Sequence, residues 1–239
     1  MSDWFEQLFG FKEKQIPYDQ IRDNFIYDFN TGILTSLPNK KQYLAGRFTN
    51  PSLSALRSEY PLDSDHIKKA IPGSIKLTEI ISDVTALHLK PENKFAVFQA
   101  ASQFNCLEFT SSTGKPENGI TCYKMDKTQG PACAISCGPG TIIRNYFAFE
   151  NDGQTKQNQI NNLGKFDSIL KNDNTKFFTV KNGYTISNDE KLKALNELLD
   201  KNEGLVELLK ENYHAGIQED TEAVSTNFGD KIFIQDEFH

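Results

Sequence analysis

The sequence predicts an α/β fold, with a mixed sheet that carries helices on its faces. The chain has 239 residues, 38% of them hydrophobic, which is enough to bury the core of one large domain. An apolar run at 95–98 leads directly into a small polar elbow at 99–105, as at the end of a buried strand. A segment rich in glycine and small residues follows at 126–140. α/β proteins commonly form a ligand crevice from a strand, a polar elbow and a glycine-rich helix start in this order.

Residues 1–60 are predicted to form a helical and hairpin extension that packs on the core. Apolar side chains recur at helical spacing near the start of the chain, and Gly10 is expected to interrupt or end that helix. The acidic residues among them favour docking on the domain over a membrane-surface helix. Residues 24–36 have the pattern of a hairpin that turns at 30–32.

Residues 61–239 are predicted to form the main domain. The apolar spacing in residues 75–89 favours a helix, but their β-branched content leaves open a strand followed by a turn. A strand is expected at 94–100. Residues 151–174 are rich in Asn, Gln, Lys and Asp, which indicates an exposed loop with one short helix around 160–170.

The last third of the chain is predicted to contain two hairpin-like segments around two helices. Residues 177–186 have the pattern of a strand, a bend and a second strand. Ser187 or Asn188 is expected to cap the helix that follows, and a second helix is expected at 205–212. Apolar and polar residues alternate enough in residues 215–238 to predict one or two strands.

Composition excludes several classes of partner. The net charge is −6 and no basic run is present, so no nucleic-acid partner is predicted. No apolar run approaches the ~20 residues of a membrane-spanning helix, so no stable membrane insertion is predicted. The N-terminus lacks the hydrophobic region of a signal peptide, which predicts a cytoplasmic protein where it is made.

No metal or other cofactor is predicted. The four cysteines have no zinc-binding spacing and are interpreted as small buried thiols: Cys106, Cys122, Cys133 and Cys137. The sequence also lacks the GxSxG, Walker A and GxGxxG motifs, which excludes the commonest hydrolase, nucleotidase and dehydrogenase patterns.

Two sets of motifs resemble known proteins. The elbow Ala101-Ser102-Gln103-Phe104-Asn105 resembles the ribose-binding elbow of macrodomains, most closely the poly(ADP-ribose)-glycohydrolase-like branch. The chain also resembles a bacterial family of macrodomain-like ADP-ribosylhydrolases that includes a secreted Legionella effector. The motifs shared with that family are QAASQFNCLE, DxTQGPACA, RNYF, NGY and DTE, at 99–108, 126–134, 144–147, 182–184 and 220–222.

The resemblance implies a macrodomain-like fold with an N-terminal extension and an ADP-ribosylhydrolase activity. The implied partner is ADP-ribose or an ADP-ribosylated protein, and the family relation implies secretion into a host cell by a non-classical route. Two departures affect the mechanism. Cys106-Leu107-Glu108 stands where the macrodomain elbow has three glycines, and Gln129-Gly130 stands where the branch has its catalytic Glu pair. A different carboxylate is therefore required, and a non-catalytic ADP-ribose reader is the alternative function. A third interpretation is a structural protein whose small residues only pack.

Three elbow residues are candidate ribose contacts. The amide of Asn105 offers both a donor and an acceptor to ribose hydroxyls, although Asn is also a common turn residue at a strand end. Gln99 and Ser102 share the elbow, where Ser102 has an alternative role as a cap of the next turn.

Asp126 is the first candidate for the catalytic carboxylate. Hydrolysis of an ADP-ribosyl bond passes through an oxocarbenium-like state, which a carboxylate stabilises or serves by activating water. The alternative is that Asp126 is only a helix N-cap. Glu108 is the second candidate, and Asp220 and Glu222 are the third.

The phosphates of the ligand are assigned to the small-residue segment and to Arg144. The backbones of Gln129 and of three glycines are expected to approach a diphosphate, unless the glycines only allow close helix packing: Gly130, Gly138 and Gly140. Pro139 favours a loop at 138–140. Arg144 either clamps a phosphate or pairs with a buried acid.

Overall fold

The architecture is known from a computed structural model of the chain. The structure describes residues 3–61, 74, 76–81, 84–94, 96–126, 128–150, 152–224 and 228–236.

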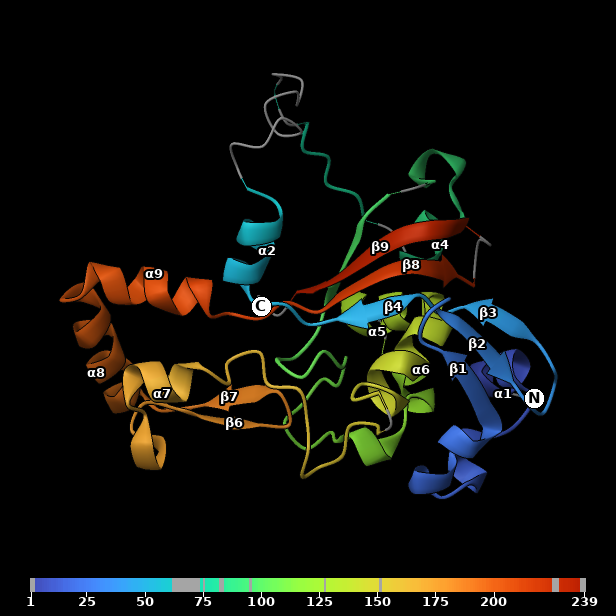
Figure 1. Cartoon of the computed structure of the whole chain (residues 1–239), viewed down its shortest axis with the longest axis horizontal. Coiled ribbons are helices and arrows are strands. Elements are labelled where there is room, and N and C mark those ends of the chain that lie inside the picture. Colours follow the sequence, from blue (N-terminus) through green and yellow to red (C-terminus); the bar gives the residue numbers. More distant parts are fainter. Residues whose placement is uncertain are drawn as a thin grey trace.

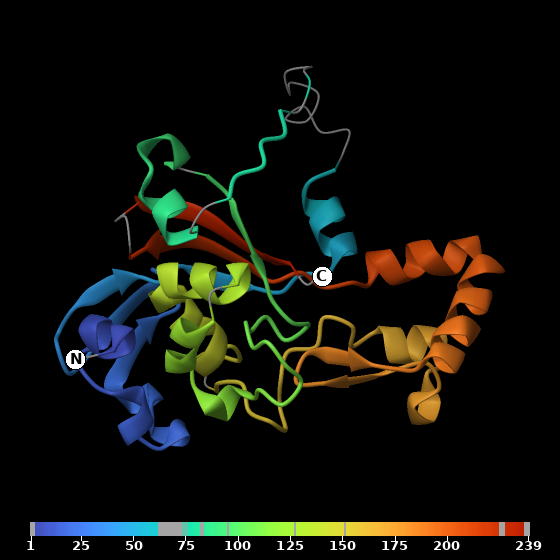
Figure 2. The same cartoon turned by 180° about the vertical axis from the view of Figure 1, so that it is seen from behind.

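The main sheet has four strands in the order β4-β8-β9-β5. The strands are β4 (Arg47–Thr49), β8 (Ile217–Ala223), β9 (Phe228–Asp236) and β5 (Phe98–Ala101). β5 runs parallel to β9, whereas β4 and β9 are both antiparallel to β8. Figures 1 and 2 show these strands, from distant parts of the sequence, side by side. The prediction of an α/β protein with a mixed sheet is confirmed.

Two consecutive helices pack against this sheet. They are α5 (Gln129–Ser136), which lies against β5, and α6 (Gly138–Tyr146), which lies against β8 and β4. The prediction of a loop at 138–140 is wrong, because α6 begins at Gly138 and Pro139 occupies its first turn. A proline fits that position because the first N–H groups of a helix have no partner within it. α4 (Val84–Leu89), which precedes β5 in the sequence, contacts α5.

The N-terminal region forms a three-stranded antiparallel sheet in the order β1-β2-β3. The strands are β1 (Phe25–Asp28), β2 (Ile33–Ser36) and β3 (Gln42–Leu44), so the predicted hairpin is confirmed. The predicted first helix is α1 (Trp4–Phe9), capped by Asp3 and ended by Gly10 at a φ of 79°. A left-handed residue of this kind is a common helix end.

One hydrophobic core joins the N-terminal region to the main sheet. It combines Trp4, Phe5 and Phe9 with Ile142 and Tyr146 of α6. Phe5 and Phe9 are fully buried. The extension is therefore part of the main core, and β4, within residues 1–60, is an edge strand of the main sheet.

A second core lies in the C-terminal half. The hairpin of β6 (Thr179–Lys181) and β7 (Tyr184–Ile186) packs with three helices: α7 (Phe166–Leu170), α8 (Asp189–Asp200) and α9 (Glu203–Glu211). Figure 1 shows these elements together at one end of the molecule. The Asn188 side chain caps α8 by accepting the Lys191 N–H, one of the two caps predicted.

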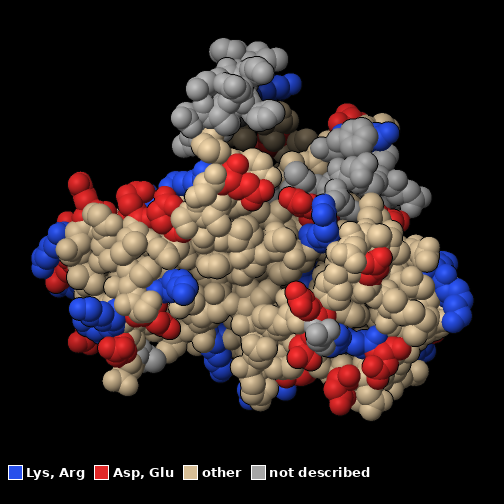
Figure 3. All heavy atoms as spheres, viewed as in Figure 1, with Lys and Arg blue, Asp and Glu red and all other residues tan. Residues whose placement is uncertain are grey.

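The remaining elements are short. α2 (Leu53–Glu59) follows β4. The 3-10 helices are η1 (Glu13–Gln15), η2 (Tyr18–Gln20), η3 (Arg22–Asn24), η4 (Pro91–Asn93), η5 (Pro116–Asn118), η6 (Thr121–Met125) and η7 (Asp173–Thr175). Among the described residues, no helix combines the length and apolar character needed to cross a membrane. On the face in Figure 3, acidic and basic side chains are mixed around a largely uncharged centre.

Candidate functional site

The predicted elbow at 99–105 begins inside β5, which ends at Ala101, and most of the elbow side chains are buried. Ser102, Gln103 and Asn105 are almost or fully buried, whereas Gln99 within β5 is exposed. The elbow closes on itself, because the Gln103 N–H donates to the Leu107 carbonyl at 2.9 Å. The residue between them, Cys106, takes a left-handed φ of 61°. The chain thus turns back sharply after the strand.

Both functions of the Asn105 amide are used within the protein. Its Oδ1 accepts the Leu107 N–H at 3.1 Å, which is the turn role that the sequence left open. Its Nδ2 donates to Gln159 Oε1 at 2.9 Å. Gln159 Nε2 in turn donates to Asn182 Oδ1 at 3.0 Å. A ribose contact by Asn105 stays a prediction, and it requires Gln159 to move aside.

Gln159 and Asn182 line a polar cleft of about 280 Å³, which we call the amide cleft. It lies between the loop at 156–161 and the tip of the β6–β7 hairpin. The residues that line it are Lys156, Gln157, Gln159, Ile160, Asn161, Val180, Lys181, Asn182 and Gly183. Two exposed lysines and several amides give the cleft donors that suit an anionic, hydroxyl-rich ligand.

The hairpin tip fits against the elbow because it contains a glycine. The Phe104 N–H donates to the Gly183 carbonyl at 3.0 Å. A Cβ at Gly183 would lie 2.5 Å from Cβ of Gln103 and 2.7 Å from Cγ of Asn105. Gly183 also has a φ of 78°, which favours glycine. The Asn-Gly pair in the sequence indicates a turn, but it does not reveal that the turn docks on the elbow.

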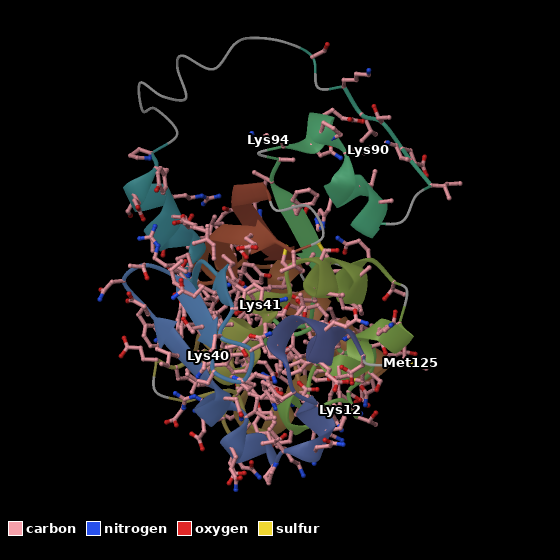
Figure 4. All side chains as sticks on the ribbon, turned by 90° about the vertical axis from the view of Figure 1, so that its right-hand side faces the viewer. Lys12, Lys40, Lys41, Lys90, Lys94 and Met125 are labelled. Atoms are coloured by element: carbon pink, nitrogen blue, oxygen red, sulfur yellow. The ribbon has the colours of Figure 1, made fainter. Side chains whose placement is uncertain are left out.

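Asp126 is half-buried at the start of α5 and remains accessible. Its Oδ1 accepts the Thr128 N–H at 2.8 Å and also the Thr128 hydroxyl. These bonds, with a weaker one from Thr110, hold the pKa of Asp126 below its usual range. The neighbouring Met125 is 89% exposed and lies at the edge of the molecule in Figure 4. The carboxylate is therefore ionised at neutral pH and open to solvent. Thr128, rather than Asp126, is the N-cap residue of α5.

A tyrosine links Asp126 to the elbow. The Tyr184 hydroxyl donates to the Phe109 carbonyl at 2.6 Å and accepts from Gln103 Nε2 at 3.1 Å. Burial raises the pKa of Tyr184, and the charge of Asp126 adds to that effect. The other amide atom, Gln103 Oε1, is buried without a hydrogen-bond partner among the described residues. Tyr184 thus bonds to Gln103 of the elbow and lies close enough to Asp126 to sense its charge, and neither Asp126 nor Tyr184 lines the amide cleft.

Glu108 and Arg144 pair with each other in the core. Arg144 Nη2 lies 2.9 Å from Glu108 Oε1, and both side chains are fully buried. Arg144 also donates to Gln218 Oε1 at 2.6 Å and to Thr141 Oγ1 at 3.0 Å. This is the buried-acid pairing that the sequence left open for Arg144. Loss of either partner would leave a buried charge, at a cost of roughly 3–5 kcal/mol.

Gln129 serves the sheet rather than a ligand. Its Oε1 accepts the Ala101 N–H at 2.6 Å, and its Nε2 donates to the Gln99 carbonyl. The side-chain amide therefore pairs with β5 along the edge that faces away from β9, which satisfies backbone groups that an edge strand leaves open.

The three candidate glycines are explained by close packing. A Cβ at Gly130 would lie 1.9 Å from the Ala101 carbonyl oxygen, and one at Gly140 would lie 2.8 Å from the Gln218 side chain. A Cβ at Gly138 would lie 3.0 Å from Leu8. All three are buried, so their backbones face protein in this structure.

The last two candidate carboxylates are Glu222 and Asp220. Glu222 Oε2 accepts the Leu44 N–H at 2.9 Å, which ties β8 to β3. The side chain of Asp220 lies outside the described part of the structure. Comparison with models of known protein families, with curated proteins and with solved structures finds no match to this chain.

Proposed function

We propose that this chain binds ADP-ribose and removes it from a modified protein. The observation that carries the proposal is the state of Asp126. Of the three candidate carboxylates whose side chains are described, Glu108 is buried in an ion pair and Glu222 is bonded to β3. Asp126 is ionised, accessible and fixed beside the elbow.

In this proposal the ligand lies along the tip of the β6–β7 hairpin. Its diphosphate faces Lys156 and Lys181 of the amide cleft. Its distal ribose reaches past Tyr184 toward Asp126, and Gln103 Oε1 accepts one of its hydroxyl groups. Gln103 Oε1 is buried, so this contact requires the side chains around it to move, and the hydroxyl would then satisfy an acceptor that has no partner among the described residues.

The lowered pKa of Asp126 determines its chemical role. A carboxylate that is stabilised in its charged form is a weak base, so it takes a proton from water poorly. It is better suited to stabilising the positive charge that develops on the ribose ring as the glycosidic bond breaks. The bonds from Thr128 keep the carboxylate in one orientation, which such stabilisation requires.

The test is release of free ADP-ribose from proteins modified through different linkages. Asp126→Asn should reduce release about 10²-fold or more, while calorimetry shows ADP-ribose binding retained. Asp28→Asn is the matched control. Asp28 makes the same kind of bonds, to Thr31 and the Asn30 N–H, in the turn between β1 and β2. An Asp126→Asn variant that hydrolyses at the wild-type rate would exclude Asp126 as the catalytic group.

A non-catalytic ADP-ribose reader is the second candidate. It is favoured by the burial of Glu108 in an ion pair and by the bond that ties Glu222 to β3, which leave Asp126 as the remaining carboxylate among the described candidates. Most glycosidases use two carboxyl groups. Tight binding of ADP-ribose by the wild type, with no release from any linkage, would establish the reader. An absence of both binding and release would exclude both functions.

A further inference from the structure

The second core borders an apolar cavity of about 570 Å³ that is open to the surface on one side. Its walls come from α7, the β6–β7 hairpin, α8 and α9, which Figure 1 shows together at one end of the molecule, and from α2 and the elbow. The lining includes Leu53, Phe104, Leu163, Phe178, Leu195 and Leu209. The cavity and the amide cleft have no lining residue in common, although both adjoin the β6–β7 hairpin.

The cavity is an open apolar concavity of the surface, not a void left inside the core. Protein interiors are close-packed, and voids larger than a water molecule are few. An apolar cavity gives water no hydrogen-bond partners, so water fills it poorly. This cavity adjoins the second core, and it falls within the range of about 300–1,000 Å³ that is usual for small-molecule sites. Leu192, in its wall, is 45% exposed, so the cavity opens to the surface.

The lining contains one charged residue among its described members, Lys210. The Lys210 side chain is 55% exposed, and its Nζ lies 2.7 Å from Glu207 Oε1 in the same helix. The charge therefore lies at the surface end of the cavity. The hydroxyl groups of Thr185, Ser187 and Tyr213 supply the other polar atoms of the lining. The site thus offers an apolar interior, with Lys210 and its partner Glu207 at the rim.

We infer that this cavity binds a free long-chain fatty acid, with the hydrocarbon chain inside and the carboxylate near Lys210. The chemistry matches at both ends, because apolar burial drives the chain inward and the carboxylate of the ligand takes the place of Glu207 beside Lys210. A protein partner fits less well. Stable protein interfaces bury about 800 Å² of surface on each side. This site is instead a concavity walled by six segments of one chain, which suits a small molecule better than a protein surface. The inference does not depend on the ADP-ribose proposal.

The test titrates hexadecanoate, below the concentration at which it forms micelles, into the full chain by calorimetry. We expect one saturable site per chain. Val206→Trp places a ring in the cavity and should weaken binding at least tenfold without lowering the melting temperature. Leu208→Trp is the matched control, because Leu208 is on the same helix, 47% exposed and outside the lining. It should bind as the wild type does.

The carboxylate is tested separately. Lys210→Gln should weaken hexadecanoate binding about two- to fivefold, the scale of an exposed ion pair, and leave hexadecanol binding unchanged. Lys201→Gln, on the exposed turn between α8 and α9, should change neither. If Val206→Trp fails to fold, Leu199→Phe replaces it. Absence of saturable binding by the wild type, or equal binding by the filled variant, overturns the inference. A dimer in sedimentation experiments that the filled variant abolishes would also overturn it, by assigning the cavity to a second copy of the chain.

Discussion

At the scale of single residues, Asp126 shows how two local bonds set the charge of a candidate catalytic group. Both come from Thr128, through its N–H and its hydroxyl. They favour the charged form, so the pKa of Asp126 is lowered. The stability that they contribute is present at neutral pH and is lost as the pH falls through that lowered pKa.

A carboxyl titration by NMR tests this arrangement. The Asp126 midpoint should lie below the ordinary value of about 3.9, and Thr128→Val should raise it because valine cannot donate the side-chain bond. Asp28 is the internal control. Its pKa is lowered by Thr31 and should not respond to the change at Thr128. An Asp126 midpoint that is the same in both proteins would contradict the assignment. In the wild type, hydrolysis should not fall between pH 8 and pH 5, since Asp126 stays ionised there.

At the scale of elements, the contact between α5 and β5 depends on the absence of a side chain at Gly130. Any Cβ there would meet the Ala101 carbonyl oxygen at 1.9 Å, so the helix would have to move away from the strand. That movement would also break the two bonds between Gln129 and the strand.

Gly130→Ala should therefore destabilise the protein by about 3 kcal/mol, the upper range for overpacked sites. Gly204→Ala is the matched control within α9, where nothing lies within 4 Å of an added Cβ. Since alanine is the better helix former, this control should stabilise the protein by up to about 1 kcal/mol. Urea unfolding measures both changes. A Gly130→Ala variant as stable as the wild type would show that close packing does not require this glycine.

Elements with local signals could be predicted from the sequence, and contacts between distant segments could not. The Asn-Gly turn at 182–183 and the Asn188 cap each act within a few residues. The parallel pairing of β5 with β9 and the pairing of Glu108 with Arg144 depend on the whole fold. In the candidate site, the elbow was located correctly, but its burial was not. The amide cleft was missed because its two sides are far apart in sequence.

At the scale of the whole molecule, a buried carboxylate fastens the N-terminal region to the main core. Glu13 accepts the N–H groups of Ile120 and Thr121, each at 2.8 Å, and the Tyr146 hydroxyl at 2.6 Å. Burial raises the pKa of Tyr146, and the charge of Glu13 raises it further. With the shared hydrophobic core, these bonds predict that both regions unfold together.

Glu13→Ala leaves three donors without an acceptor and should cost about 3 kcal/mol or more. Urea unfolding should show one transition, shifted to lower urea with an unchanged slope. Glu6→Ala, at a half-buried position where Glu6 lies 4.0 Å from Lys12 Nζ, should cost less than about 1 kcal/mol. Two separate transitions in Glu13→Ala would mean that the N-terminal region is an independent unit.

The order of the strands in the main sheet also has a consequence during synthesis on the ribosome. The strand that pairs with β5 is β9, which is made much later. At the usual rate of synthesis, the ribosome takes on the order of ten seconds to move from one to the other. During that interval the nascent chain holds β5 without its neighbouring strand, and the Gln129 side chain is a partner for the β5 backbone that has already been made. A chaperone that shields a single unpaired strand for those seconds would raise the yield of folded protein.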